Sequence, residues 1–590
     1  MDPDLDLPQR PSRTHRNPQS KPTPKPPRRE PEDEDHDFPA LREDWFRAGR
    51  TSQSQKPAAQ LRHEAIAQRL ATEYRLRAHS STPTPNWQEL GPRPQVSSQY
   101  GNLAGRITAI AIDTSRDPSG NTVYVGTAYG GLWKTSNGMS ANPAFTPLTE
   151  NAPTLSVGSI ALDASTNPTT IYIGSGEPDS SIDSYYGVGV LKSTDGGTTW
   201  TTSSIADAGS ESFYGQSFSK LLVDPNDPEL LIACTRLSGT PTYRSLTSGI
   251  FRSIDYGATW QMMYEAPNGC SDLTYQPSTN TYFAAIRGVG VLASKQGGSS
   301  WVMLPTPFAS GTPATLTNTR RIALASRNTE LWALLIDSTG NLSTPVPCPA
   351  ATGSCDTGLS VSNDGGYTWT SVNAPPTAFG SSSQGWYDLY IGTPGNSGAV
   401  VLGGIDLWWG QWDGTANIAW SNLTNGYSGG SVHPDQHAFA ALDAAHWYIG
   451  NDGGLWTTTS SGQSWTNANA SIGAIQFTSV SADPILSAQY FGGSQDNGTA
   501  VSLQNSSNWN TIYAGDGGYT LAATKTAARY LTENYSISLR RTDDRGTTFN
   551  TIVDSSTIAD NSGFYVPYQF SDSSESSILL GTCRLWRGPT

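Results

Sequence analysis

The stretch that decides the fold is residues 193–200, which read STDGGTTW. An aspartate in such a turn accepts hydrogen bonds from backbone N–H groups two residues further on, and glycine supplies the positive φ that the turn needs. Tryptophan is large and apolar, so we expect it to anchor the turn in the gap between neighbouring sheets. The motif therefore predicts a structural turn and not a catalytic site.

The same turn recurs along the chain. Clear copies occupy residues 253–260 and 362–369, and weaker copies begin at Thr135, Ser294, Thr458 and Thr542. Apolar alternation and Gly-Gly steps separate the copies, so each unit is expected to hold about four short strands, which is the pattern of a β-propeller. Counting the units predicts an all-β fold of about nine to eleven blades. Either one ring of about ten blades or a seven-bladed ring with part of a second would fit.

Composition agrees with this class of fold. The chain has 590 residues with 59 Gly, 10% aromatic residues and only 15% charged residues. It contains no apolar run long enough to span a membrane, and its aromatic content is too high for a wholly disordered protein. The net charge of −14 leaves no basic face for nucleic acid. We therefore expect a propeller that binds neither membrane nor nucleic acid.

Three regions follow one another along the chain. Residues 1–56 are rich in Pro, Arg and acid and are predicted to be disordered. Residues 57–86 contain an apolar pattern at helical spacing, which predicts one short helix and a linker. The propeller is expected to fill residues 87–590 and to stop within its last blade, because the final strand precedes any further copy of the turn.

Beyond the turn, six short segments carry a resemblance to a known family. They are GRITAI at 105–110, YVGT at 124–127, GGLW at 130–133, GSGE at 174–177, HPDQH at 433–437 and GSQDNG at 493–498. With the turns, they resemble the Asp-box, or bacterial neuraminidase repeat, β-propeller superfamily, in particular a bacterial secreted group of glycosyl-hydrolase-like and sortilin-like proteins. The superfamily includes enzymes and binding proteins, so the fold alone does not decide the function.

Two catalytic activities of the superfamily can be compared with the residues. Sialidases carry an Arg-Ile-Pro segment, whereas here Arg321 and Ile322 are followed by Ala323, so a sialidase is not expected. Xyloglucan-type hydrolases resemble this chain at residues 124–131, where their segment carries one catalytic aspartate. Ala128 stands at that position. Inverting hydrolysis needs two carboxylates, so this substitution leaves open whether the protein is an enzyme.

The topology of a blade locates the predicted site. The Asp-box turn joins the third and fourth strands on one face, so residues that follow each second strand are expected to converge on the opposite face, around the channel. The polar residues at these points include Glu177, Asp179, Asp406, Asp452 and Asp496. Glu177 and Asp179 are the candidate acid/base pair. A hydrated polar channel is the alternative interpretation.

Aromatic residues could provide platforms beside this polar ring. Trp408 and Trp409 are the candidate sugar-binding platforms, together with Trp386 and Tyr387. Core packing between the blades is the alternative interpretation for all four.

His433, Asp435 and His437 form the densest cluster of candidate site residues. In a strand they project from one face, and two histidines with one carboxylate make a known metal-ligand set. However, successive side chains on one strand face are about 6.6 Å apart, so a single metal could not easily reach all three. A substrate-binding or catalytic role for the cluster, with Asp435 as the catalytic group, and a structural role lining the channel remain open beside metal binding.

The leading functional prediction is a secreted, glycan-directed propeller that is glycoside-hydrolase-like, with catalysis and binding alone both left open. The alternative is a scaffold for proteins or peptides that resembles sortilin or photosystem II assembly factors. A polysaccharide or protein ligand is expected on the channel face, and no cofactor is expected. The resemblance implies an extracellular or periplasmic location, although no signal peptide is visible. Cys348 and Cys355 could form a local disulfide, which would fit an oxidising compartment.

Overall fold

The protein was analysed as a computed structural model, which describes residues 42, 45, 56–79, 88–179, 184–237, 247–305, 319–337, 358–375, 377–379, 384–504 and 506–590. The tail predicted to be disordered, residues 1–56, thus lies outside the described residues except for Arg42, Trp45 and Lys56. Within the described ranges, no helix combines the length and the apolar character that a membrane crossing requires.

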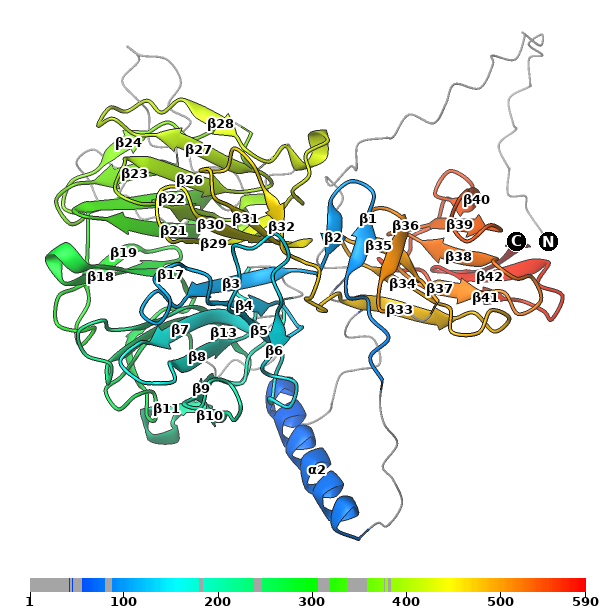
Figure 1. Ribbon diagram of the computed structural model, residues 1–590, viewed down its shortest axis with the longest axis horizontal. Helices are drawn as coiled ribbons and strands as arrows, with labels where there is room; N and C mark the ends of the chain where they lie inside the picture. The colour runs from blue at the N-terminus through cyan, green and yellow to red at the C-terminus, as the bar shows by residue number, and fades with distance from the viewer. Residues whose placement is uncertain are drawn as a thin grey trace, which may run out of the picture.

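Seven four-stranded antiparallel sheets follow one another around a ring (Figure 1). The first four consist of β3 (Ile107–Ile112), β4 (Val123–Thr127), β5 (Leu132–Thr135) and β6 (Thr146–Pro147); β7 (Val157–Asp163), β8 (Thr170–Ser175), β9 (Val190–Ser193) and β10 (Thr201–Ser203); β13 (Gln216–Val223), β14 (Leu231–Leu237), β15 (Gly249–Ser253) and β16 (Gln261–Glu265); and β17 (Cys270–Gln276), β18 (Thr281–Ile286), β19 (Gly290–Ser294) and β20 (Val302–Met303). A small hairpin of β11 (Ile205–Ala206) and β12 (Glu211–Ser212) separates the second and third sheets.

The last three sheets of the ring are built in the same way. They consist of β21 (Thr319–Arg327), β22 (Glu330–Asp337), β23 (Leu359–Ser362) and β24 (Thr370–Val372); β25 (Tyr390–Gly392), β26 (Ala399–Gly403), β27 (Leu407–Gln411) and β28 (Trp420–Asn422); and β29 (Gln436–Ala441), β30 (Trp447–Asn451), β31 (Gly454–Thr458) and β32 (Thr466–Asn467).

The ring closes between its last and first sheets. The first strand of each sheet contacts the first strand of the next, and β29 contacts β3. Tyr448 of β30 is fully buried, packs in one cluster with Val123 of β4, and donates a hydrogen bond from its hydroxyl to Gly120 O at 2.9 Å. Second strands such as β8 are buried along their whole length, because a neighbouring sheet covers each face.

The three clear copies of the repeated turn share one hydrogen bond: the aspartate side chain accepts from the N–H group four residues further on, at 2.9 Å in each copy. At the first copy, Asp195 accepts bonds from the N–H groups of Thr198 at 3.0 Å and Thr199 at 2.9 Å. The Asp195 carboxylate therefore accepts from residues three and four positions further on, and our prediction of two positions was wrong. The positive φ of Gly196 and Gly197 turns the chain so that these later N–H groups face the carboxylate. The Trp200 indole N–H bonds to Leu148 O of the preceding sheet at 2.9 Å, so the expected anchoring between neighbouring sheets is confirmed.

A second group of sheets lies beside the ring (Figure 1). It contains β33 (Phe477–Ala482), β34 (Tyr490–Ser494), β35 (Gly498–Ser502) and β36 (Trp509–Tyr513); β37 (Thr520–Ala522), β38 (Tyr530–Glu533), β39 (Ser538–Thr542) and β40 (Asn550–Asp554); and β41 (Tyr568–Phe570), β42 (Ser577–Gly581) and β43 (Leu585–Pro589). We call this group the second array. Two strands from before the ring, β1 (Gln95–Ser97) and β2 (Gly101–Leu103), extend its first sheet, with β1 parallel to β36.

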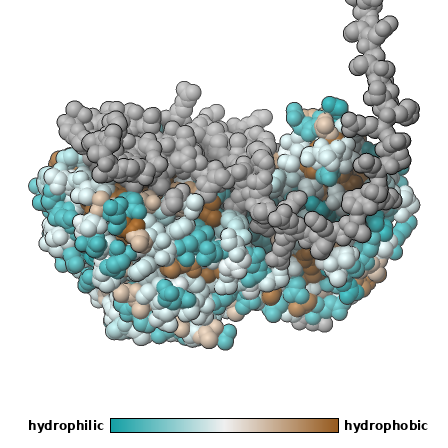
Figure 2. All heavy atoms as spheres, turned by 90° about the horizontal axis from the view of Figure 1, so that it is seen from above, coloured by the Kyte–Doolittle hydropathy of each residue, from teal (hydrophilic) through white to brown (hydrophobic). Residues whose placement is uncertain are grey.

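The architecture confirms the predicted all-β propeller. Of the two arrangements that the repeats allowed, the structure has the seven-bladed ring with further sheets, the second array, after it. Seen from above, the surface in Figure 2 is mostly teal and white, with brown apolar residues scattered over it. White residues of intermediate hydropathy are expected on the surface of a chain in which only 15% of residues are charged.

The one predicted short helix is α2 (Ala58–His79). Its first turns pack on the ring: Ala59 is 3% exposed in the cluster between the first two sheets. His63 Nδ1 lies 2.9 Å from the Tyr214 hydroxyl, and the Arg62 guanidinium lies 4.6 Å from the centre of the Tyr129 ring. Further along, Tyr74 is exposed, and Figure 1 shows this end projecting away from the ring.

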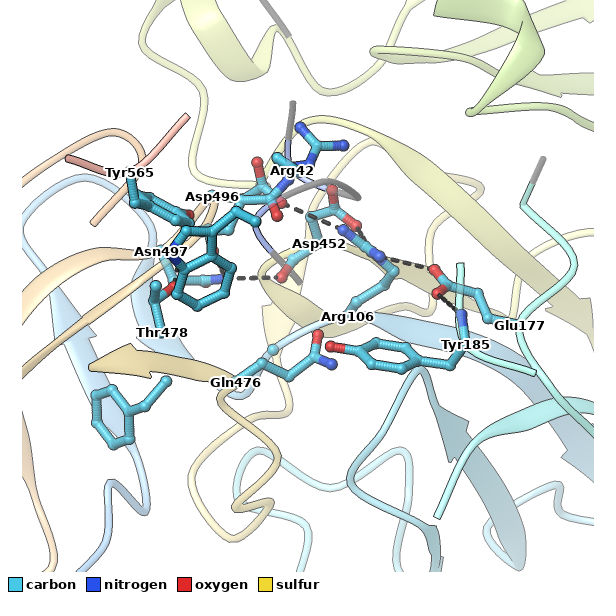
Figure 3. Close-up of a pocket in the computed structure, with 14 residues that line it drawn as sticks. Arg42, Arg106, Glu177, Tyr185, Asp452, Gln476, Thr478, Asp496, Asn497 and Tyr565 are labelled. Carbon is cyan, nitrogen blue, oxygen red and sulfur yellow. Dashed lines mark hydrogen bonds and ion pairs between the residues drawn. The ribbon is translucent and has the colours of Figure 1, made fainter. Parts of the chain in front are cut away.

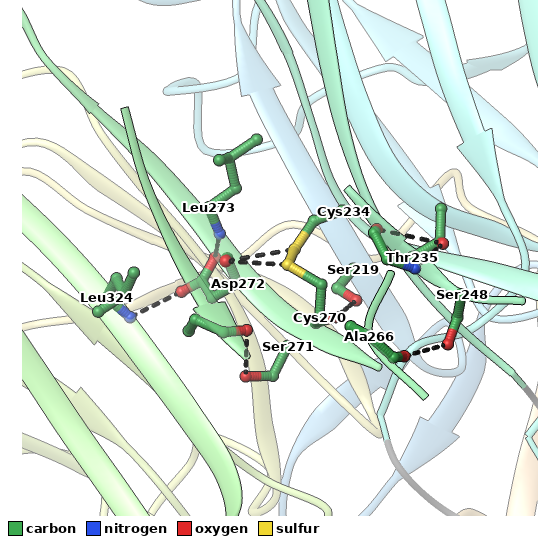
Figure 4. Close-up of a disulfide and its surroundings, with 12 residues drawn as sticks. Ser219, Cys234, Thr235, Ser248, Ala266, Cys270, Ser271, Asp272, Leu273 and Leu324 are labelled. Atoms are coloured by element: carbon green, nitrogen blue, oxygen red, sulfur yellow. Dashed lines mark hydrogen bonds between the residues drawn. A yellow bond between two sulfur atoms is a disulfide. The ribbon is translucent and has the colours of Figure 1, made fainter. Parts of the chain in front are cut away.

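A disulfide joins two neighbouring sheets of the ring (Figure 4). Cys234 of β14 bonds to Cys270 at the start of β17, and both residues are fully buried. We did not predict this pair. The predicted pair, Cys348 and Cys355, lies outside the described residues, and Cys583 is an exposed free thiol.

Candidate functional site

A cavity of about 260 Å³ lies where the ring meets the second array (Figure 3). The ring contributes Gly105, Arg106, Glu177, Tyr185 and Asp452; the second array and the link to it contribute Gln476, Phe477, Thr478, Gln495, Asp496, Asn497 and Tyr565; and Arg42 and Trp45 come from the N-terminal region. Polar groups and aromatic rings together form this wall. We call this space the cleft.

Arg106 is the centre of the cleft. Its guanidinium bonds to three carboxylates: Nε to Asp452 Oδ1 at 2.6 Å, Nη1 to Glu177 Oε1 at 2.7 Å, and Nη2 to Asp496 Oδ2 at 3.3 Å. The same guanidinium lies 5.0 Å from the centre of the Tyr387 ring. Arg106 precedes β3, whereas Asp496 follows β34, so this one side chain links the ring to the second array.

Asp452 is the most heavily bonded of the three carboxylates. Beside Arg106, it accepts a hydrogen bond from the Tyr387 hydroxyl at 2.9 Å, and its Oδ1 lies 2.8 Å from His437 Nε2. Burial opposes the charge of Asp452, but Arg106 and His437 outweigh burial and hold the pKa of this carboxyl far below its usual range. Asp452 is therefore ionised and acts as a fixed anchor.

Asp496 behaves in the opposite way. Burial, together with the charges of Asp452 and Asp516, raises the pKa of Asp496 well above its ordinary value, although Arg106 and Arg42 counteract this. The backbone N–H of Asp496 also donates to Asp516 Oδ1 at 3.0 Å. Its side chain is 22% exposed, against 1% for Glu177 and 2% for Asp452. Asp496 is thus the most accessible of the three carboxyls.

A second charged group lies deeper, towards the centre of the ring. His437 Nδ1 is 3.5 Å from Asp179 Oδ2, and Arg321 Nη2 is 3.6 Å from Asp179 Oδ1. Burial lowers the basicity of His437, but Asp179 and Asp452 outweigh it and raise the pKa of the imidazole. Asp179, Arg321 and His437 line a separate cavity of about 140 Å³ formed by the first strands of the sheets. His437 therefore connects this channel to the cleft through Asp452.

The structure brings together only some of the predicted site residues. Glu177, Asp452 and Asp496 line the cleft, whereas Asp179 and His437 lie in the channel beneath it. His433 lies beside the cleft, with its Nε2 3.1 Å from Asp496 O and its ring 4.7 Å from that of Tyr100.

Other predicted residues lie elsewhere. Asp435 has a positive φ of 61° and accepts a bond from the Tyr427 hydroxyl. Asp406 holds a turn through bonds from Asn422, Thr424 and Gly426. Trp408 and Trp409 pack into the apolar clusters on either side of their sheet. Among the described residues, no group of three or more His, Cys, Asp or Glu side chains is placed to hold a metal ion.

Several cleft residues were not predicted from the sequence. Arg106 belongs to one of the family segments but was not among the predicted site residues, although an arginine is conspicuous in a region so poor in charge. Tyr185 follows Glu177 by eight residues and stacks on Tyr129 with ring centres 4.4 Å apart, and no local pattern reveals this. Ala128 is 1% exposed, and its N–H donates to the backbone oxygen of Arg106 at 3.1 Å, so it contacts the main chain of the central arginine.

Asp388 gives a test of the electrostatics near the channel. It is fully buried, and neither carboxylate oxygen has a hydrogen-bond partner among the described residues. Burial is the main cause that raises its pKa to about 8. The folded state thus keeps a proton that the unfolded chain releases at its ordinary pKa of 3.8, so stability falls as pH rises through this window.

Asp388→Asn should remove this loss. We expect the variant to gain about 3 kcal/mol over the wild type at pH 8 relative to pH 5, measured by denaturant unfolding at both values. Asp413→Asn is the matched control, because Asp413 is exposed and already hydrogen-bonded. If the variant and the wild type differed in unfolding free energy by the same amount at both pH values, the raised pKa of Asp388 would be contradicted.

Comparison with known proteins agrees with the fold. No family model matches the chain. A xyloglucanase from Paenibacillus sp. is 27% identical over 364 residues, which cover 58% of this chain and 30% of that protein. The chain thus spans less than a third of the length of this relative.

Two solved structures are similar at low sequence identity. A GH74 enzyme of Niastella koreensis superposes with a TM-score of 0.55 and 17% identity, covering 83% of this chain and 71% of the other. An ancestral GH74 enzyme gives a TM-score of 0.51 and 13% identity, covering 86% and 77%. Both likenesses concern the fold.

Proposed function

We propose that this chain is a glycan-binding, glycoside-hydrolase-like propeller protein that holds a polysaccharide segment in the cleft between the ring and the second array. One observation carries the proposal: Arg106, Glu177 and Asp496 converge beside the aromatic rings of Tyr185, Phe477 and Tyr565 in one cavity. Sugars present hydroxyls at their edges and apolar C–H groups on their faces, so they fit a wall of polar groups and aromatic rings. The xyloglucanase relative supports a β-glucan ligand.

We assign binding, and not hydrolysis, to the cleft. Ala128 stands where the resemblance expects a catalytic aspartate, and Glu177 is ion-paired with Arg106 at 2.7 Å. Of the candidate catalytic residues Glu177, Asp179 and Asp435, only Glu177 lines the cleft. The buried Cys234–Cys270 disulfide fits an oxidising compartment, which supports a location outside the cytoplasm.

The proposal is tested with immobilised xyloglucan and other β-glucans. The wild type should be retained, and reducing ends released from soluble xyloglucan should stay at the level of a protein-free blank. Tyr185→Ala should weaken retention, whereas Tyr367→Ala should not, because Tyr367 is 60% exposed in a turn of the fifth sheet. Failure of every glucan to retain the wild type would refute glycan binding, and released reducing ends would refute the assignment of binding only.

Asp496 should make the binding depend on pH. Burial and the neighbouring charges of Asp452 and Asp516 raise its pKa, so this carboxyl keeps its proton to a higher pH than an exposed aspartate does, and in its protonated form it can donate a hydrogen bond to a sugar hydroxyl. Glycan affinity should fall by about 3- to 10-fold as pH rises through that pKa. Asp496→Asn keeps a donor and cannot ionise, so its affinity should stay constant over the same range. Calorimetric titration across pH 5–9 checks this, and an identical pH profile in both proteins would contradict it.

A peptide ligand is the second candidate, because one observation favours it. Arg42 and Trp45, from the N-terminal region of the same chain, line the cleft. The cleft thus accommodates a cationic and an aromatic side chain of a polypeptide. If glycans fail to bind, short peptides with this pair of residues are the next ligands to test.

A further inference from the structure

The N-terminal residues Arg42 and Trp45 form part of the wall of the cleft, and their side chains fit against aromatic residues of the second array. The Trp45 indole N–H donates to the Tyr519 hydroxyl at 3.0 Å, and its ring makes T-shaped contacts with Tyr519 and Tyr565 at centre-to-centre distances of 6.0 and 5.2 Å. Arg42 is 4% exposed, and its guanidinium lies 5.4 Å from the centre of the Phe564 ring. An aromatic slot of the second array therefore holds both side chains.

Charge complementarity adds to this aromatic contact. Arg42 interacts electrostatically with Asp496 and Asp516 at the edge of the slot. Arg42 and Trp45 are both helical and three residues apart, a spacing that places two side chains on the same side of a helical turn. The slot thus receives a cation and an aromatic ring from a single turn of chain.

Helix α2 keeps this part of the chain near the cleft. Its first turns dock on the ring through Ala59, Arg62 and His63, and Arg62 lies over Tyr129. Tyr129 in turn stacks on Tyr185, which lines the cleft. Because only 12 residues separate Trp45 from Ala58 in the sequence, the local concentration of Arg42 and Trp45 at the slot is on the order of millimolar.

We infer that Arg42 and Trp45 are an internal ligand of this slot, which borders the cleft, and that an external ligand of the cleft competes with them for it. The competition rests on the proposed function, whereas the occupancy of the slot does not. A ligand that binds only the open state loses apparent affinity in proportion to the closed fraction. Displacement of Arg42 and Trp45 from the slot therefore regulates glycan binding.

A peptide in trans tests the occupancy without any glycan. The probe is a fluorescent peptide of residues 38–50, FPALREDWFRAGR, titrated by anisotropy against the full-length wild type and full-length Arg42→Ala/Trp45→Ala. We expect the peptide to bind the double variant at least 10-fold more tightly, because its slot is empty. The same peptide with both residues replaced by alanine should bind neither protein. Equal binding of the native peptide to both proteins, or to neither, would overturn the inference.

The glycan tests the competition. Affinity for a xyloglucan oligosaccharide should rise about 5- to 10-fold in Arg42→Ala/Trp45→Ala. Arg69→Ala/Tyr74→Ala is the matched control, because both residues are exposed on the projecting part of α2. Unchanged or weaker glycan affinity in the cleft variant would overturn the competition. If the peptide discriminates between the proteins and no glycan binds either, the occupancy stands and the proposed glycan function fails.

Discussion

Arg106→Met is expected to lower the free energy of unfolding by about 3–5 kcal/mol and to abolish glycan retention. Methionine keeps much of the arginine's length but removes the charge that Glu177, Asp452 and Asp496 share. Glu177 and Asp452 are almost fully buried, so they would be left as like charges away from water. Such groups are costly unless they are paired. The link between the ring and the second array would weaken at the same point.

Denaturant unfolding followed by intrinsic tryptophan fluorescence measures this loss. Arg75→Met serves as the control, since Arg75 is exposed on α2. Asp452→Asn introduced into the Arg106→Met background should recover part of the stability, because it removes one of the stranded charges. A variant as stable as the wild type would contradict the view that Arg106 holds the cleft together.

Removal of the disulfide is expected to have the second-largest effect. Cys234→Ala/Cys270→Ala frees a loop with a sequence separation of 36 residues, and the entropy gained by the unfolded chain corresponds to about 3–4 kcal/mol. The bond joins β14 to β17 between neighbouring sheets, so its loss also weakens the contact between two blades. We expect the melting temperature to fall by about 3–5 °C.

Scanning calorimetry under oxidising conditions measures this shift. Cys583→Ala is the matched control, because this thiol is exposed and free, and it should melt with the wild type. Addition of a reductant should lower the melting temperature of the wild type and leave that of the double variant unchanged. Equal melting temperatures of the double variant and the wild type would show that the bond adds no stability.

The fold was predictable because its signal is local and repeated. Eight residues, 193–200, contain the carboxylate, the glycines and the tryptophan that build one turn, and further copies reveal the array. The repeats left the choice between one ring and two open, because ring closure depends on the contact of β29 with β3. No segment of sequence encodes that contact by itself.

The candidate site was predictable only in part. Glu177, Asp452 and Asp496 could be placed because each follows a second strand, and topology brings such positions to one face. Arg106 could not be predicted as a site residue, because its role depends on three carboxylates that come from distant parts of the chain. Arg42 and Trp45 lie in a region whose composition predicts disorder, which hides two residues that contact the second array.

Hydrogen exchange of the full-length protein with and without a saturating xyloglucan oligosaccharide tests the central claim most directly, because it reports binding and its place together. The account predicts slower exchange in peptides that cover residues 105–106, 184–185, 476–478 and 495–497, which come from both the ring and the second array. Peptides that cover the exposed turns at 195–199 and 364–368 should be unchanged. Protection confined to those turns, or no protection at any concentration of the sugar, would contradict a glycan-binding cleft.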